Sequence, residues 1–265
     1  MVEDAAELHR AAAAEKSVEL CVDVAIAAPA WFVGDGPRIR RCLRSLIGNA
    51  VKFTEAGHVL VSATETEQDG LLLSVSDTGI GIASDKFDAI FRAFEQIEGG
   101  DTRRYDGMGL GLPVAKRFAA LMGGTVEVRS AQGRGSTFEL RLPLRRAAAQ
   151  PAAAPAAEVD LRNRRALIVD DLEANRRVLA GRLERWGMNV VVASGADEAE
   201  EFLRRSSAAG RLVDVAILDQ RMPGRSGLDL FRALRGDPAL IRVPTVILSS
   251  SAKDSAREMR EAGVE

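Results

Sequence analysis

The chain has 265 residues, of which 46% are hydrophobic and 28% are charged, a balance typical of soluble globular domains. Its formal net charge is −2, so no global basic field draws it to nucleic acid or to an anionic membrane. No apolar stretch approaches the roughly 20 residues of a membrane span, and acidic residues follow Met1 where a signal peptide would be basic. We therefore expect a cytoplasmic chain that is long enough for two domains.

The first half of the chain mixes strand and helix patterns. An amphipathic helix is predicted over 38–53, where apolar residues recur at i, i+3 and i+4. The other predicted elements, in chain order, are strands at Val18–Val24, Val59–Ala63 and Leu71–Ser76, helices at 84–94 and 110–122, and hairpin strands at Thr125–Arg129 and Thr137–Leu142 closing on Gln132-Gly133. These elements predict a mixed α/β layer. Cys21 and Cys42 have no CxxC or Cys/His spacing, which favours buried reduced thiols over a disulfide.

Residues 145–162 are rich in Ala and Pro, and prolines resist a continuous helix. We predict a linker there, between domains at 17–144 and 163–265 and after a helical segment at 1–16. The second domain alternates helical patterns with four apolar, β-branched runs, which is typical of parallel βαβ units. The runs are Ala166–Val169, Val190–Ala193, Val213–Leu218 and Thr245–Leu248.

A polar stripe follows the helix predicted over 38–53. Ser45, Asn49 and Lys52 lie at helical spacing beside the apolar face. Asn is a poor residue for a helix interior, and its amide oxygen is a suitable ligand for Mg²⁺, while Lys52 could meet a phosphate. A solvated helix face explains this stripe equally well.

Two glycine-rich segments follow. In DTGIGI, Asp77 ends a predicted strand, where its carboxylate can accept a hydrogen bond from an exocyclic amine, and Gly79 and Gly81 let the backbone approach a flat ring. An ordinary turn is the alternative. In GMGLGL, glycines precede a helix N-terminus, which favours polyphosphate binding. A polar stretch at 98–106, and not a strand, precedes them, which argues against a dinucleotide-binding Rossmann site.

Four segments stand in the order of the boxes of a known domain: SLIGNAVKFTEAG, DTGIGI, FRAFEQ and GMGLGL. The first domain thus resembles the ATP-binding domain of sensor histidine kinases, in the superfamily of gyrase, Hsp90 and MutL. The resemblance implies an α/β sandwich of the Bergerat type that binds ATP and Mg²⁺. It implies that Asn49 holds Mg²⁺, Lys52 contacts phosphate, Asp77 recognises adenine, Gly79 and Gly81 shape the base pocket, Phe91 and Phe94 anchor a lid, and Arg103, Gly107, Gly109 and Gly111 cover the phosphates.

The sequence departs from this family at three positions. Ser45 replaces the usual Asn, Met108 replaces a common hydroxyl residue, and Asp106 replaces a usual Gly. These departures bear on nucleotide affinity. Ser45 also stands where hydrolytic relatives carry a Glu base, so the pattern favours a kinase over an ATPase of the gyrase or Hsp90 kind.

Three strands of the second domain are followed by oxygen-bearing side chains. Asp170 and Asp171 follow the first, Asp219 the third and Ser249 the fourth. Because the carboxyl ends of parallel strands share one edge, these groups should meet there. Clustered carboxylates require a cation, and oxygen ligands favour Mg²⁺.

The segments RALIVDD, ILDQRMPGRSG and VPTVILSSS resemble a response-regulator receiver domain. The resemblance implies a flavodoxin-like parallel fold in which Asp219 is the phosphoacceptor and Ser249 the switch hydroxyl. Asp170, Asp171, Asp219 and the carbonyl of Arg221 would bind Mg²⁺. The family's fifth strand and its lysine are expected beyond Glu265, and Lys253 does not take that role. We therefore expect a truncated receiver that accepts phosphate poorly.

Together, the two domains resemble a hybrid sensor histidine kinase, which moves the γ-phosphoryl of ATP to a histidine and then to an aspartate. His9 lacks the acidic neighbour and the proline of the family's histidine box, and His58, at the start of a predicted strand after Gly57, is expected to be structural or exposed. We expect that histidine on a dimerisation domain that is missing upstream or supplied in trans, with residues 1–16 ending its linker helix. The fragment alone should then not autophosphorylate. Expected partners are that domain and a downstream phosphotransfer protein or response regulator, and the parent is expected to be a homodimer. A non-catalytic nucleotide-binding and receiver module that acts with a separate kinase is the alternative.

Overall fold

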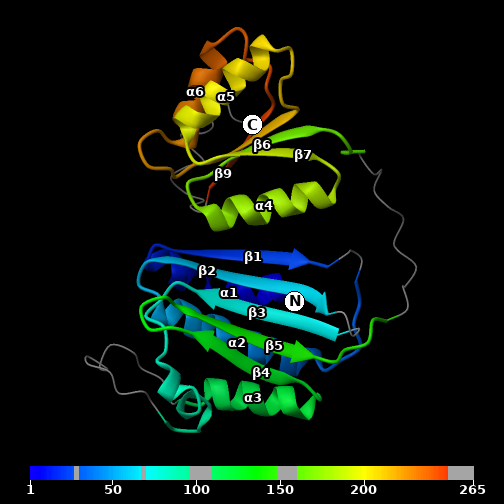
Figure 1. Ribbon diagram of the computed structural model, residues 1–265, viewed down its shortest axis with the longest axis vertical. Coiled ribbons are helices and arrows are strands. Elements are labelled where there is room, and N and C mark those ends of the chain that lie inside the picture. The colour runs from blue at the N-terminus through cyan, green and yellow to red at the C-terminus, as the bar shows by residue number, and fades with distance from the viewer. Residues whose placement is uncertain (27–29, 67–69, 96–108, 148–159, 250–265) are drawn as a thin grey trace. The chain divides into compact units, whose positions relative to one another are not determined.

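The computed structural model describes residues 1–26, 30–66, 70–95, 109–147 and 160–249 and is drawn in Figure 1. The chain divides into two compact units, Met1–Pro155 and Ala156–Glu265. Within the described ranges, no helix has both the length and the apolar character that a membrane crossing requires. Each unit is described by itself below.

The first unit contains a five-stranded mixed sheet. Its spatial order is β1-β2-β3-β5-β4, as Figure 1 shows. Only the pairing of β1 with β2 is parallel; the other three pairings are antiparallel. The bounds are β1 Val18–Ala25, β2 Gly57–Thr66, β3 Gly70–Asp77, β4 Thr125–Ser130 and β5 Ser136–Leu142. The predicted mixed sheet and its closing hairpin are confirmed.

Three helices pack against this sheet: α1 (Val2–Glu15), α2 (Gly36–Phe53) and α3 (Gly111–Leu121). The central helix is α2, whose first turn contains Pro37 and whose N-terminus is capped by Asp35. Its apolar stripe is fully buried at Leu43, Leu46 and Ile47 against sheet residues such as Leu73 and Leu140. Burying large aliphatic side chains from both layers is the main stabilising term of such a sandwich.

The first helix, α1, shares this core through Ala5, Ala6 and Ala13. Lys16 follows it and points its ammonium at the C-terminal end of α2. The Nζ of Lys16 donates to the backbone oxygens of Val51, Lys52 and Thr54 at 3.0, 2.6 and 3.2 Å. A cation there satisfies carbonyls that the helix leaves without an internal partner and complements the helix dipole.

The helix predicted at 84–94 is wrong. The structure has two short 3-10 helices, η1 (Ser84–Lys86) and η2 (Ala89–Phe91). Arg92 then turns to extended backbone, and Phe94 has a φ of 64°. The Phe94 side chain is 77% exposed, so no apolar packing rewards a further helical turn. Short helices without such packing are marginal in water.

The second unit contains a four-stranded parallel sheet of order β7-β6-β8-β9. Its strands are β6 Arg165–Val169, β7 Asn189–Ala193, β8 Val215–Asp219 and β9 Thr245–Leu248, and its helices are α4 Glu173–Arg185, α5 Ala196–Ala208 and α6 Gly227–Gly236. Alternate residues of β6 face opposite layers: Leu167 packs with the side of α5 and α6, and Ile168 with the side of α4. The predicted parallel, flavodoxin-like fold is confirmed.

The chain leaves the first unit through a backbone pairing that the sequence did not suggest. Phe32 and Arg146 form an antiparallel bridge. The amide of Val33 donates to Arg145 at 2.9 Å, and the amide of Ala147 donates to Trp31 at 2.7 Å. Residues 145–147 of the predicted linker are therefore held on the first unit, while 148–159 lie outside the described residues. Cys21 and Cys42 are both buried, as predicted, and no disulfide joins them.

Candidate functional site

Asp77 lies at the carboxyl end of β3 and is held by two backbone amides. Its Oδ1 accepts hydrogen bonds from Gly79 at 2.9 Å and from Ser136 at 3.3 Å. Burial raises the pKa of this carboxyl. The hydrogen bonds from the two backbone amides oppose that rise in pKa without cancelling it. The structure thus fixes the orientation of a half-buried carboxylate at the position predicted to read adenine.

Gly79 and Gly81 are required by the packing of their own loop. A Cβ on Gly79 would lie 2.3 Å from the carbonyl oxygen of Phe53, and one on Gly81 would lie 2.0 Å from that of Ala131. Gly81 also has a φ of +66°, a region that L side chains disfavour. The DTGIGI loop is therefore in close contact with the end of α2 and with the β4–β5 turn, so both glycines set the path of the backbone beyond Asp77.

Sequence reasoning missed Gly135 and Ser136. Gly135 has a φ of +81°, and a Cβ there would meet the carbonyl oxygen of Asp77 at 1.9 Å. Ser136 is buried and supplies one of the amides that hold the Asp77 carboxylate. The available signal was the second glycine in the QGRGS turn. The predicted closing turn at Gln132-Gly133 stops short of Gly135, whose role depends on its approach to Asp77 on β3.

The N-terminal end of α3 lies against the polar stripe of α2. A Cβ on Gly111 would lie 2.4 Å from the Oγ of Ser45. Ser45, Asn49 and Lys52 are all half-buried, so this stripe is not a fully solvated helix face. The structure thereby brings the end of the second glycine segment next to the helix that carries Asn49.

The lid predicted between these elements is described only at its ends. Gly109 has a φ of +66° and approaches the backbone of Phe94 and Glu95. Phe91 packs against the core, and the Nζ of Lys116 lies 4.6 Å from its ring centroid. Phe94 is exposed. The predicted phosphate-contacting residues Arg103 and Gly107, with Asp106 and Met108, lie outside the described residues.

His9 lies on α1 with its ring against α2. A Cβ on Gly48 would lie 3.1 Å from the ring carbon Cε1 of His9. Burial, and to a lesser extent the charge of Arg44, lower the pKa of His9, so its neutral form is favoured in the folded protein. Its Nε2 is buried and has no hydrogen-bond partner in the part of the chain that is described. His9 is thus a packing residue in this fold.

In the second unit, the predicted acidic residues lie at the carboxyl edge of the sheet. Val169 of β6 pairs with Leu218 of β8, so Asp170 and Asp219, which follow them, are neighbours at that edge. Asp170 is 3% exposed and its Oδ1 accepts from the amide of Leu172 at 2.8 Å. The Oδ2 of Asp219 accepts from the amide of Arg221 at 2.9 Å.

The fourth strand reaches the same edge. Leu248 of β9 pairs with Asp219, and Ser249 follows it in an exposed position. Asp171 is also exposed. Gly227 approaches from the start of α6: a Cβ there would lie 2.3 Å from the backbone oxygen of Asp219. The edge thus combines a buried carboxylate, a half-buried one and a hydroxyl residue.

The donor set at this edge is all oxygen, which is the kind that Mg²⁺ prefers. Among the described residues, however, no three His, Cys, Asp or Glu side chains gather closely enough to hold a metal ion. Asp170, Asp171 and Asp219 therefore do not form a cage of three carboxylates. A site built on Asp170 and Asp219 with a backbone carbonyl fits these residues better.

Comparison with known proteins gives two family matches. Residues 34–146 match the family described as histidine kinase-, DNA gyrase B-, and HSP90-like ATPase. Residues 166–265 match the response regulator receiver domain. A fold comparison with full-length ShkA, whose crystal structure is a complex with AMPPNP, gives a TM-score of 0.61 at 21% identity, over 99% of this chain and 82% of that one.

Curated relatives resemble nearly the whole chain. Sensory/regulatory protein RpfC of Xanthomonas campestris is 33% identical over 94% of this chain and 38% of its own length. Sensor histidine kinase AruS of Pseudomonas aeruginosa is 39% identical over 88% of this chain and 24% of its own. Aerobic respiration control sensor protein ArcB of Escherichia coli is 34% identical over 99% of this chain and 33% of its own. The chain thus spans well under half of these relatives.

The fold and the matches define a two-domain protein, with a domain of the ATPase family followed by a receiver domain. Residues 34–146 belong to the histidine kinase-, DNA gyrase B-, and HSP90-like ATPase family and residues 166–265 to the response regulator receiver domains, and this pair of domains is the one found in the hybrid sensor histidine kinases that the chain resembles.

Proposed function

We propose that the chain serves a phosphorelay in which Mg²⁺–ATP binds the first domain and Asp219 of the second domain receives a phosphoryl group. The observation that carries this proposal is the shared strand edge of Asp170 and Asp219 in a chain that also contains a nucleotide-binding fold. The γ-phosphoryl of ATP would first move to a histidine on a dimerisation domain of the parent protein. Asp219 or a partner's aspartate would then accept it.

Asp77 is the proposed reader of the adenine base. Both amide hydrogen bonds described for its carboxylate reach Oδ1, which directs Oδ2 to accept from the exocyclic amine of adenine. Burial of the Asp77 carboxyl raises its pKa. The same low-dielectric surroundings strengthen the hydrogen bond that the charged carboxylate would make with adenine. A charged acceptor selects a base with an amine over one with a carbonyl at that position.

Asn49 and Lys52 are the proposed contacts of the polyphosphate. Both are half-buried on α2, beside the region where Gly111 approaches Ser45. The amide oxygen of Asn49 would hold Mg²⁺, Lys52 would contact phosphate, and backbone amides at the start of α3 would face the phosphates. Mg²⁺, when bound, neutralises phosphate charge. Arg103, Gly107, Gly109 and Gly111 remain the proposed lid over the phosphates.

At the receiver edge, an oxygen of Asp219 would form the new P–O bond as the P–N bond to the donor histidine breaks. The histidine nitrogen keeps the bonding electron pair and takes up a proton. Asp170, Asp219 and the backbone carbonyl of Arg221 are the proposed ligands of Mg²⁺, with the exposed carboxylate of Asp171 next to them in the chain. The Ser249 hydroxyl is the proposed contact of the phosphoryl oxygen. The amide of Arg221 already fixes one oxygen of Asp219.

Ser45 bears on the alternative of a hydrolytic ATPase. It occupies the place of the catalytic Glu, and its Oγ faces Gly111. A hydroxyl there does not supply the carboxylate base that activates water. We therefore favour phosphoryl transfer with partners: a histidine-containing domain within the parent or in trans, and a downstream phosphotransfer protein or response regulator.

Mass spectrometry after treatment with Mg²⁺ and acetyl phosphate tests the proposal. A phosphoryl group should appear on Asp219 and be absent from Asp219→Asn. Asp160→Asn is the matched control, because Asp160 is exposed and lies before β6. Undiminished labelling of Asp219→Asn would refute the assignment of the acceptor.

A further inference from the structure

The loop that follows Asp219 carries the chemistry of the proposed acceptor site, and its two ends are fixed. At its start, the amide of Gln220 donates to the carbonyl of Leu248 at 2.8 Å. At its end, Ser226 caps α6 in a capping box with Asp229. Between them, Gly224 has a φ of +78°, so the backbone turns sharply there. Met222 is buried in the core, and the exposed turn at Pro223 and Gly224 lies between it and Ser226.

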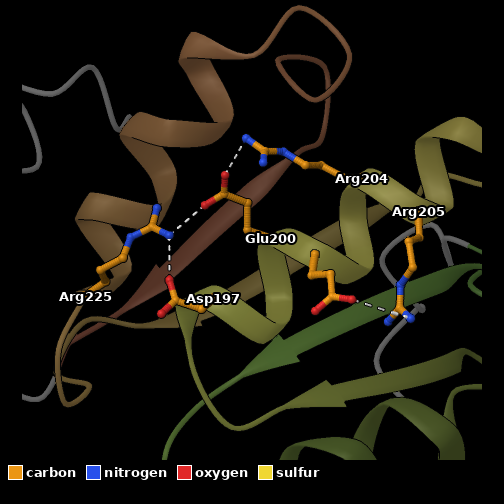
Figure 2. A pocket seen from close by; sticks show the side chains of 6 residues that line it. Asp197, Glu200, Arg204, Arg205 and Arg225 are labelled. Atoms are coloured by element: carbon orange, nitrogen blue, oxygen red, sulfur yellow. Dashed lines mark hydrogen bonds and ion pairs between the residues drawn. The ribbon is translucent and has the colours of Figure 1, made fainter.

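Arg225 anchors this turn by reaching from the loop to α5, as Figure 2 shows. Its Nη1 lies 2.8 Å from the Oδ1 of Asp197 and 2.7 Å from the Oε2 of Glu200. Asp197 and Glu200 stand three positions apart on α5 and so share one helix face. The second oxygen of Glu200 lies 2.7 Å from the Nη2 of Arg204.

This contact differs from an ordinary surface ion pair, which contributes little. The side chain of Glu200 is only 16% exposed, whereas that of Asp197 is 87% exposed. A mostly buried carboxylate requires compensating partners, and removing one of them leaves its charge poorly balanced. Of the two contacts that Arg225 makes, the one with Glu200 is the stronger, and Asp197 adds a second, weaker hold.

The helix on the other side of the contact is rigidly held. Ala196, Ala199 and Leu203 of α5 lie in the core with Val169 and Leu218, the last core residues before Asp170 and Asp219. Arg225 thus connects the loop after Asp219 to the same packed unit that carries the two carboxylates. If the loop moves relative to α5, it therefore also moves relative to Asp170 and Asp219.

We infer that Arg225 is a positioning residue for phosphoryl transfer to Asp219: its contact with Glu200 and Asp197 holds the loop so that Arg221 stays in place beside the acceptor. The inference rests on the proposed function of Asp219. Arg221 matters twice, because its amide donates to Asp219 at 2.9 Å and its carbonyl is a proposed Mg²⁺ ligand. Loss of the anchor should therefore affect metal use and transfer together.

The rate of Asp219 phosphorylation by acetyl phosphate, measured over a range of Mg²⁺ concentrations, tests this inference. Arg225→Ala should need more Mg²⁺ for half-maximal rate and react on the order of tenfold more slowly at limiting Mg²⁺, as for other groups that orient metal ligands. Arg225→Lys should restore part of the rate. Hydrogen exchange should increase over 220–226 in Arg225→Ala.

Arg205→Ala is the matched control. Arg205 faces Glu201 at 3.8 Å on α5, and both side chains are 71% exposed, so this variant loses an equal charge next to the same network without touching the loop. Its rate and Mg²⁺ dependence should equal those of the wild-type chain. In a Glu200→Gln background, Arg225→Ala should have a smaller effect than in the wild-type background, because the principal contact is already weakened.

Two results overturn the inference while leaving the proposed function intact, both with Asp219 labelled in the wild-type chain. In the first, the rate and Mg²⁺ dependence of Arg225→Ala equal those of Arg205→Ala. In the second, a smaller folded fraction, measured by thermal unfolding, fully explains the slower rate of Arg225→Ala. Failure of the wild-type chain to label Asp219 at all refutes the proposed function and this inference with it.

Discussion

Replacing Asp77 by Asn removes a charge from the end of β3 and keeps the shape of the side chain. The amide oxygen of Asn can occupy the place of Oδ1, which accepts from Gly79 at 2.9 Å and from Ser136 at 3.3 Å. The amide nitrogen then takes the place of Oδ2 and presents hydrogens to the adenine amine, which is also a donor. The fold should persist while the base loses its acceptor.

The expected loss of ATP affinity follows from the bond that is removed. A hydrogen bond to a charged group contributes about 1.5–3 kcal/mol. At 1.4 kcal/mol per factor of ten, its loss should make the dissociation constant for ATP roughly 10- to 150-fold larger. Isothermal titration calorimetry measures it directly. Asp4→Asn, which removes the same charge at an exposed position of α1, should bind ATP as the wild-type chain does.

The pH dependence gives a second measurement. Burial raises the pKa of Asp77 in the folded chain above its value in the unfolded chain, so folding takes up a proton. This carboxyl therefore stabilises the fold at pH below both pKa values, and that contribution is lost as the pH rises through the folded pKa. ATP affinity should change in the opposite direction, falling as the pH drops through the folded pKa. Unchanged affinity in Asp77→Asn, with the fold intact, would refute the assignment of Asp77 to adenine.

Three further predictions concern the first unit. Gly81→Ala should lower the free energy of unfolding, measured by urea titration, by about 1–3 kcal/mol, because its Cβ would meet the Ala131 oxygen at 2.0 Å. Gly133→Ala is the control: its φ is +75° but nothing lies within 4 Å of its Cβ, so it should lower the free energy of unfolding less. Lys16→Met should lower the unfolding free energy by about 1.5–3 kcal/mol, since three carbonyls at the end of α2 lose their donor; an unchanged melting temperature would contradict this. Burial lowers the pKa of His9 below 6.5, so its neutral form contributes stability that is lost as the pH falls through the folded pKa. His9→Gln should therefore flatten the acid limb of the stability profile, and an identical profile would show that His9 does not titrate on unfolding.

The sequence predicted the motifs and their supporting strands because each signal was local. Asp77, Gly79 and Gly81 stand in one short segment, and Asp170 and Asp219 follow apolar runs whose parallel pairing brings their ends together. The helix predicted at 84–94 failed because its apolar spacing said nothing about what would pack against Phe94, which the structure leaves exposed.

Other features depend on contacts between residues far apart in the chain. The contacts of Lys16 with the end of α2 span more than 30 positions, and no composition or periodicity marks that lysine. Gly135 matters because its backbone approaches Asp77 on a neighbouring strand. The Arg225 anchor likewise needed the packing of α5 beside the loop, which only the folded structure supplies.

The attachment of α1 to α2 has a mechanical consequence. With 14 residues, α1 is a stiff rod about 21 Å long. His9 rests on Gly48 near its middle, and Lys16 grips the last turn of α2, where Lys52 lies, at its far end. Because Ala5, Ala6 and Ala13 also fix α1 in the core, a displacement of α1 would be transmitted to this last turn of the helix that is proposed to meet the phosphates.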